Sequence, residues 1–171
     1  KWNEMVDAYP SLGLGYLAAI GEQEGHECRI FDFGLVPHRS IAEEVQDVVD
    51  YRPDLVAFTS MTTSYASVEE SAALLKDALG VTTIIGGPHA TSLPDETLQN
   101  PHLDYLIYGE GEEVFQDFLR GLAAGANNWD DMPGLWYKQD GKVISGGERA
   151  LIKDLDALPF PARHLFELDK Y

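Results

Sequence analysis

The stretch Thr82–Thr91 reads TTIIGGPHAT and joins a short β-branched run to a pair of glycines. The run from Thr82 to Ile85 favours a buried, pleated strand. Gly86 and Gly87 follow at its carboxyl end, where glycine allows a positive φ and lets a ligand approach bare backbone. Ligands of open parallel α/β sheets bind outside the carboxyl ends of the strands. The stretch therefore predicts either a binding edge or a tight turn that needs glycine.

The rest of the chain alternates helical and strand patterns. Helices are expected over residues 11–24, 41–52, 67–79 and from 112 onward, with a helical turn at 94–99; strands are expected over 28–33, 54–59, 82–85 and 104–108. Ser40 with Glu43, and Ser67 with Glu70, have the spacing of capping boxes that begin helices. This alternation predicts an α/β fold with a doubly wound parallel sheet. Because the pattern enters with a helix, we expect a preceding strand, from Lys1–Asp7 or, preferably, from chain upstream.

The C-terminal part of the chain changes character. Residues 134–138 and 142–145 flank Asp140-Gly141, which is typical of a β-hairpin turn. The segment Leu151–Tyr171 then alternates acidic, apolar and proline residues, as an ordered connector would. We therefore expect an α/β domain over residues 1–126, a small hairpin over 127–150 and a connector over 151–171.

The composition limits the partners of the protein. Its 171 residues carry a formal net charge of -17. Nucleic acids and anionic membranes attract positive surfaces, so neither is an expected partner. A ligand with a phosphate group stays open, because backbone N–H groups can hold one without lysine.

Cysteine usage points to a reducing compartment. Cys28 is the single cysteine, so no disulfide forms within the chain. An iron–sulfur cluster needs several thiolates, so a buried core thiol is the expected role of Cys28. This cysteine usage fits a protein of the reducing cytoplasm. No apolar run reaches the ~20 residues of a membrane-spanning helix, and no signal peptide is visible.

Polar and glycine-rich loops follow the expected strands at one edge. They cover residues 7–15, 60–63, 86–91 and 109–112, and they offer backbone donors and hydroxyl groups. No second ligand stands at metal-binding spacing from His89 in its loop, so His89 is expected to form hydrogen bonds at the rim. Glu110 and Glu112 are not expected to form an acid–base pair, because helical residues two apart do not face each other.

A dinucleotide site is the alternative of the same fold class. Gly13–Ala18, GLGYLA, matches G-x-G-x-x-G/A, and Asp32 follows about 20 residues later. That motif needs a strand that runs directly into the glycines, and Asp7–Ser11 does not have such a pattern. A close contact between helix and sheet explains Gly13 and Gly15 equally well.

Several motifs together resemble one family. PSLGLGYLAAIGEQEGH, DLVAFTSMT, IIGGPHATSLPDE, DYLIYGEGE and LDALPFPARHL are similar to the N-terminal cobalamin-binding domain of cobalamin-dependent radical S-adenosylmethionine enzymes, such as the anaerobic magnesium-protoporphyrin monomethyl ester cyclase group. The resemblance covers roughly residues 10–171. It implies a flavodoxin-like sheet with cobalamin on its carboxyl edge.

The resemblance also implies which residues bind the cofactor. A Ser-x-Leu/Thr loop and a glycine pair line the nucleotide tail of cobalamin in such domains, and Ser60-Met61-Thr62 and Gly86-Gly87 match them. The expected cofactor-binding residues are Leu12, Gly13, Ser60, Met61, Thr62, Thr63, Gly86, Gly87, Pro88, His89, Gly109, Glu110 and Gly111, with no catalytic or metal-ligating residue among them.

Two family motifs are absent from the chain. The D-x-H-x-x-G motif that supplies a histidine below cobalt is missing, as it commonly is in the radical enzymes. The C-x-x-x-C-x-x-C motif is also missing, so a [4Fe-4S] cluster and S-adenosylmethionine are expected only in a separate C-terminal domain, which would be the partner of this one. The expected chemistry of the parent is methyl transfer or cyclisation of a small organic substrate. A further alternative is a degenerate domain that binds no cofactor and serves only interaction.

Overall fold

A five-stranded sheet forms the centre of the protein. The computed structural model describes residues 9–33, 35, 38–126 and 128–171, and its strands follow the order β1-β2-β3-β4-β5. The parallel strands are β1 (Leu55–Thr59), β2 (Thr82–Gly86) and β3 (Tyr105–Ile107). The antiparallel strands β4 (Leu135–Gln139) and β5 (Lys142–Ser145) complete the sheet. The stretch TTIIGGPHAT thus forms β2, between β1 and β3.

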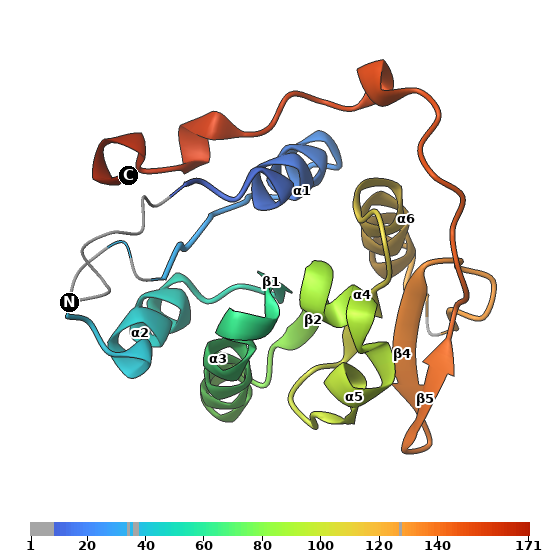
Figure 1. Cartoon of the computed structure of the whole chain (residues 1–171), viewed down its shortest axis with the longest axis horizontal. Helices are drawn as coiled ribbons and strands as arrows, with labels where there is room; N and C mark the ends of the chain where they lie inside the picture. The colour runs from blue at the N-terminus through green and yellow to red at the C-terminus, as the bar shows by residue number, and fades with distance from the viewer. Residues whose placement is uncertain (1–8, 34, 36–37, 127) are drawn as a thin grey trace.

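Helices cover both faces of the sheet (Figure 1). Helices α1 (Leu12–Gln23) and α6 (Glu112–Ala123) pack together on one face. Helices α2 (Ile41–Tyr51), α3 (Tyr65–Leu79) and α5 (Pro94–Gln99) lie on the other, and the short helix α4 (Pro88–Ser92) follows β2 directly. Pro88 occupies the first position of α4, where its missing N–H costs no hydrogen bond. The expected α/β fold is confirmed, although the sheet is mixed rather than entirely parallel.

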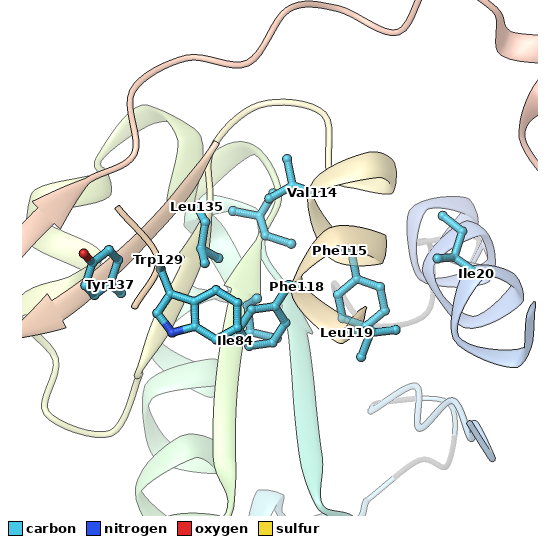
Figure 2. Packing of buried hydrophobic residues seen from close by; sticks show 10 residues of the cluster. Ile20, Ile84, Val114, Phe115, Phe118, Leu119, Trp129, Leu135 and Tyr137 are labelled. Atoms are coloured by element: carbon cyan, nitrogen blue, oxygen red, sulfur yellow. The ribbon is translucent and has the colours of Figure 1, made fainter. Parts of the chain in front are cut away.

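The larger hydrophobic core lies between α6 and the sheet (Figure 2). Phe118 and Val114 of α6 and Leu135 of β4 are fully buried. Their cluster also contains Ile20, Ile84, Ile107, Phe115, Leu119, Trp129 and Tyr137. Because residues of α1, β2, β3, α6 and β4 all contribute, this core joins the hairpin to the parallel strands.

The hairpin turn forms as its sequence predicts. Asp140 and Gly141 both have positive φ, of 51° and 73°. Two successive positive φ angles are the geometry of a type I′ turn, whose twist matches that of the flanking strands. Strand β4 pairs with β3, so the hairpin extends the main sheet.

The predicted strand over 28–33 is not confirmed. Residues 28–32 belong to no strand or helix, and the described pairing of β1 is with β2 alone. Phe31 and Phe33 instead pack their side chains against the cluster of Val45, Val48, Leu75 and Val81. An apolar pattern secures this packing, but a strand also needs a neighbour with free backbone groups. The strand considered over Lys1–Asp7 lies outside the described residues.

One of the two predicted helix caps is wrong. Ser40 and Glu43 form the expected capping box of α2. Helix α3, however, begins at Tyr65, so Ser67 lies inside its first turn and its carbonyl accepts a bond from Ser71. The 3-10 turn Thr62–Ser64 runs directly into the helix, and the ring of its first residue, Tyr65, stacks on His89.

Cys28 is half-buried rather than fully buried. A Cβ atom at Gly21 would lie 2.6 Å from its Sγ, so the thiol packs closely on α1. Burial raises the pKa of the Cys28 thiol, and the nearby charge of Glu22 raises it further. The group is therefore a packed thiol and not an activated one.

The last part of the connector packs against α1 (Figure 1). The Ala162 amide donates to the Gly15 carbonyl at 2.9 Å, and a Cβ atom at Gly15 would lie 3.0 Å from Pro161 and 3.1 Å from Phe166. Short 3-10 turns punctuate the segment at Leu155–Ala157, Arg163–Leu165 and Leu168–Lys170. Across the described residues, no helix is both long and apolar enough to cross a membrane.

Candidate ligand-binding edge

The loops after β1 and β2 meet at the carboxyl edge of the sheet. The Ser60 amide donates to the Gly86 carbonyl at 3.3 Å, and the His89 amide donates to the Ser60 carbonyl at 3.1 Å. The structure therefore brings together two of the segments from which the sequence predicted a site. Thr62 and Thr63 follow on a 3-10 turn, η1 (Thr62–Ser64), and are exposed.

Gly87 allows this close approach. Its φ is 93°, and a Cβ atom there would lie 2.7 Å from Thr59 Oγ1 and 3.1 Å from both the amide nitrogen and the carbonyl oxygen of Ser60. The packing of the protein itself thus requires glycine at position 87. At Gly86 a Cβ atom would make only ordinary contacts with Ile107, at 3.8 Å or more, so the fold does not exclude a side chain there.

Two buried side chains at this edge have unpaired polar atoms. Ser60 is 3% exposed and His89 is 4% exposed. Ser60 Oγ and His89 Nε2 have no hydrogen-bond partner, as is also true of Trp136 Nε1 on β4, among the described residues. An unpaired buried polar group costs about 1–3 kcal/mol, and most such groups in native proteins are paired. Two of them lie on touching loops, so this edge offers two unused hydrogen-bonding positions.

His89 lies beneath the rim rather than on it. Its Nδ1 lies 3.2 Å from Thr62 Oγ1, and its ring stacks on Tyr65 with the centroids 3.9 Å apart. Pro88 beside it is exposed, as are the apolar side chains of Met61 and Leu93, at 59% and 41%. Within the described ranges, no group of three or more His, Cys, Asp or Glu side chains is arranged to hold a metal ion.

The loop after β3 joins the same edge. The Gly109 amide donates to Thr91 Oγ1 at 3.2 Å, which links this loop to α4. The Glu110 carboxylate accepts a bond from the Ile152 amide at 2.9 Å, which attaches the connector. A small cavity of about 160 Å³ lies between Gly109, Glu110, Arg149 and Ile152. Gly111 continues into α6, close to Leu17 of α1.

Arg149 fixes the start of the connector beside this cavity. Its guanidinium group donates to Glu113 at 3.1 Å and to Asp117 at 2.8 Å, both on α6. Burial, the largest single influence, lowers the pKa of Arg149. The hydrogen bonds and charges of the two carboxylates together outweigh it, so the pKa is raised. The arginine therefore serves the attachment of the connector to α6.

Leu12 and Gly13 are not bonded to these loops within the part of the chain that the structure describes. Both are exposed at the start of α1, and a Cβ atom at Gly13 would meet no atom within 4 Å. No hydrogen bond of the described residues joins them to the loops after β1, β2 or β3. Their role in cofactor binding therefore stays a prediction.

The geometry does not favour the dinucleotide alternative. Gly15 packs against Pro161 and Phe166 of the connector, so it is covered by protein. The hydroxyl of Tyr171 donates to the Asp32 carboxylate at 2.5 Å. Burial and this bond raise the pKa of Tyr171, so the hydroxyl remains a donor and Asp32 is occupied. The carboxylate that would hold a ribose is thus already used within the protein.

Two residues of this edge were not among the predicted binding residues. Tyr65 stacks on His89, and Thr91 links α4 to the Gly109 loop. Thr91 lay within the predicted loop 86–91, where its hydroxyl was the available signal. Tyr65 had no such signal, because it precedes the predicted start of its helix.

Comparison with known proteins gives the family. Residues 4–119 match the model of the B12 binding domain. An uncharacterised methyltransferase of Pyrococcus horikoshii is 33% identical over 95% of this chain and 35% of its own length. The anaerobic magnesium-protoporphyrin IX monomethyl ester cyclase of Cereibacter sphaeroides is 27% identical over 91% of this chain and 26% of its own. The chain thus spans about a third of the length of these relatives, or less.

Solved structures show the same fold. The cobalamin-dependent S-adenosylmethionine radical enzyme OxsB, with aqua-cobalamin and S-adenosylmethionine bound, superposes with a TM-score of 0.76 at 17% identity, over 94% of this chain and 22% of that one. The radical S-adenosylmethionine methyltransferase TsrM of Kitasatospora setae, with cobalamin and a [4Fe-4S] cluster bound, gives 0.73 at 16% identity, over 90% and 29%. Because the family match covers more than half of the chain, the protein belongs to the B12-binding domain family, as its motifs predict.

Proposed function

We propose that this chain binds cobalamin at the carboxyl edge of its sheet and does so as one domain of a larger radical S-adenosylmethionine enzyme. The observation that carries the placement is the pair of buried, unpaired atoms Ser60 Oγ and His89 Nε2 on two touching loops. Membership of the family supports the identity of the cofactor. The chain alone is not catalytic in this proposal.

The residues of the edge fit cobalamin. The cofactor has a broad corrin ring with neutral amide side chains and a nucleotide tail, so it needs apolar surface as well as neutral hydrogen-bonding groups. Exposed Met61 and Leu93 provide apolar surface, and Ser60, Thr62, Thr63 and His89 provide hydrogen-bonding groups. We assign the tail to Ser60–Thr62 and Gly86–His89, and the rim to Gly109–Gly111, Leu12 and Gly13.

The protein contributes binding and orientation rather than bond chemistry. Bound cobalamin would supply methyl-transfer or one-electron chemistry through its cobalt. Ser60 and His89 would hold the cofactor by hydrogen bonds, while the loops after β1, β2 and β3 would exclude water from the site. The sequence lacks the D-x-H-x-x-G motif, so no histidine of this chain is assigned as a cobalt ligand.

The wider organisation is proposed from the relatives. We place the cobalamin-binding domain over residues 1–126, the hairpin over 127–150 and a connector over 151–171, which leads to a radical S-adenosylmethionine domain. That domain would hold the [4Fe-4S] cluster and S-adenosylmethionine and act with cobalamin on a small organic substrate. The relatives named as methyltransferases and cyclases support methyl transfer or cyclisation as the reaction. The single cysteine supports a reducing compartment such as the cytoplasm.

Titration with hydroxocobalamin tests the proposal. The visible spectrum of the cofactor should change in a saturable way when the protein is added, and NAD should not bind. Saturable NAD binding that Asp32→Ala removes would favour a dinucleotide domain. If the whole natural protein binds neither ligand, the domain is degenerate and the proposal fails; if only the isolated chain fails to bind, the site needs the neighbouring domain.

A further inference from the structure

Tyr65 holds the buried side chain of His89 from one side. The two rings are stacked, with centroids 3.9 Å apart and planes 25° from parallel. The Tyr65 hydroxyl donates to the Thr97 carbonyl of α5 at 3.4 Å. Burial raises the pKa of Tyr65, so the hydroxyl keeps its proton. The tyrosine ring is thus attached to α3 and α5 while it covers the imidazole on α4.

Thr62 holds the same imidazole at a second point. His89 Nδ1 lies 3.2 Å from Thr62 Oγ1. Stacking sets the plane of the imidazole, and the bond to Thr62 sets its orientation within that plane, because a half-turn of the ring would replace Nδ1 by a carbon atom. Together the two contacts fix the position of Nε2. That atom is buried and has no partner in the described part of the chain.

We propose that Tyr65 is a positioning residue, which holds the imidazole of His89 so that Nε2 forms a hydrogen bond with a polar atom of bound cobalamin. The inference rests on the proposed function and deepens it. A side chain that is already held in its bound orientation loses little freedom on binding, so its hydrogen bond contributes more to affinity. Ring contacts on the free protein therefore prepare the site for the cofactor.

The alternative explanation is that the rings of Tyr65 and His89 only pack against each other and have no role in binding. Tyr65 also contacts the buried cluster that includes Ile85, Ala90 and Leu98, and this packing alone would give it a role in stability. In that case the effects of changing Tyr65 and His89 on cobalamin affinity would be independent. If Tyr65 acts through His89, the effect of Tyr65 must disappear once the imidazole is gone.

A double-mutant cycle separates the two explanations. The variants are Tyr65→Leu, which removes the ring, Tyr65→Phe, which retains the stacking surface, and His89→Phe, which retains an aromatic ring without nitrogen. Dissociation constants for hydroxocobalamin are measured by visible absorption on the whole natural protein, well below the melting temperature of every variant. The ¹⁵N resonances of the His89 ring are recorded with and without the cofactor.

Five results are expected if Tyr65 acts through His89. Tyr65→Leu weakens binding about tenfold, and Tyr65→Phe restores the affinity to within about twofold of the unchanged protein. His89→Phe weakens binding about tenfold or more, and adding Tyr65→Leu to it causes no further loss. The Nε2 resonance of His89 moves on binding more than that of Nδ1.

Three outcomes would overturn it. If the losses from Tyr65→Leu and His89→Phe multiply in the double variant, Tyr65 acts independently of His89. If all variants bind as the unchanged protein does, or Nε2 does not respond, cobalamin does not contact His89, although the proposed function stands. If the unchanged whole protein does not bind hydroxocobalamin, the proposed function and this inference fail together.

Discussion

The two ends of strand β2 both carry buried polar side chains, but only one end satisfies them. Thr83, at the amino end, is 0% exposed, and its hydroxyl donates to the His102 carbonyl at 2.8 Å. Asp104 beside it accepts bonds from the Thr83 amide and the Lys76 ammonium group. At the carboxyl end, Ser60 and His89 are as deeply buried, yet Ser60 Oγ and His89 Nε2 have no partner.

In the proposed function, this difference separates structural polar groups from those that bind the ligand. The fully bonded amino end recovers the desolvation cost of its buried groups within the protein, so it contributes to stability. The carboxyl end does not recover that cost, which a bound ligand with matching groups would do. Changes at the amino end should therefore lower stability without changing cobalamin affinity, and changes at the carboxyl end should lower affinity.

The largest effect is expected from Gly87→Ala. The new methyl group would overlap Thr59 Oγ1 and press on Ser60, and the backbone of Gly87, with φ 93° and ψ -178°, adds strain of about 1–3 kcal/mol for a residue with a side chain. We expect the free energy of unfolding to fall by more than that and cobalamin affinity to fall at least about tenfold. Urea unfolding and absorption titration measure the two quantities.

Gly80→Ala is the matched control for this change. Gly80 also has a positive φ, of 62°, but a Cβ atom there would meet no other atom within 4 Å. It should lose about 1 kcal/mol of stability and keep its affinity. Equal affinity in both variants would show that the contact between the two loops does not shape the site.

A crossed pair of hydroxyl deletions sharpens the comparison. Ser60→Ala removes an unpaired hydroxyl, so stability should stay the same or rise by about 1 kcal/mol while cobalamin affinity falls about tenfold. Thr83→Val removes a bonded hydroxyl, so stability should fall by about 1–3 kcal/mol while affinity is retained. If both variants lose stability and neither loses affinity, the two ends of β2 do not differ in role.

A smaller effect is expected at the ion pair of the amino end. Lys76 and Asp104 are partly buried, and Lys76→Met removes the pair while keeping the length of the side chain. Partly exposed pairs of this kind contribute roughly 0–1 kcal/mol, so a small loss of unfolding free energy is expected. Thermal melting measures it, and a change in cobalamin affinity would contradict the division between the two ends.

The smallest effect concerns the pH dependence of a contact between α1 and α6. The hydrogen bond from Arg120, assisted by one from Gln116, lowers the pKa of Glu24. The contribution of this carboxylate to stability is therefore complete above its unfolded-state value near 4.5 and is lost as the pH falls through the lower folded-state pKa. Glu24→Gln should be slightly less stable than the unchanged protein at pH 7 in urea. The gap should close in strong acid, and a gap that widens there would contradict the assignment.

The sequence predicted elements better than contacts between elements. Helix α6, strand β2 and the Asp140-Gly141 turn each depend on local patterns, and all formed as expected. The strand expected over residues 28–33 did not form, because strand pairing also needs a neighbouring strand with free backbone groups, which a local pattern does not reveal. Helix α3 begins at Tyr65, before the capping signal at Ser67, and the contact of Tyr65 with His89 joins two segments that no local signal relates.

The candidate site shows the same limit. The sequence predicted that Ser60, Gly86, Gly87 and His89 would lie at one edge, because the carboxyl ends of parallel strands meet. It did not predict that His89 would be buried, or that Ser60 Oγ and His89 Nε2 would lack partners. Those facts arise only where two loops close over each other around Gly87.

One spectrum tests the contrast between the two ends most directly. Amide ¹H–¹⁵N resonances of the whole natural protein are recorded while hydroxocobalamin is added. We expect the largest shifts over residues 60–63, 86–91 and 109–111, with Thr83 and Asp104 almost unmoved. Shifts that gather at the amino end of β2 or at the hairpin, or a spectrum that does not change, would contradict the account.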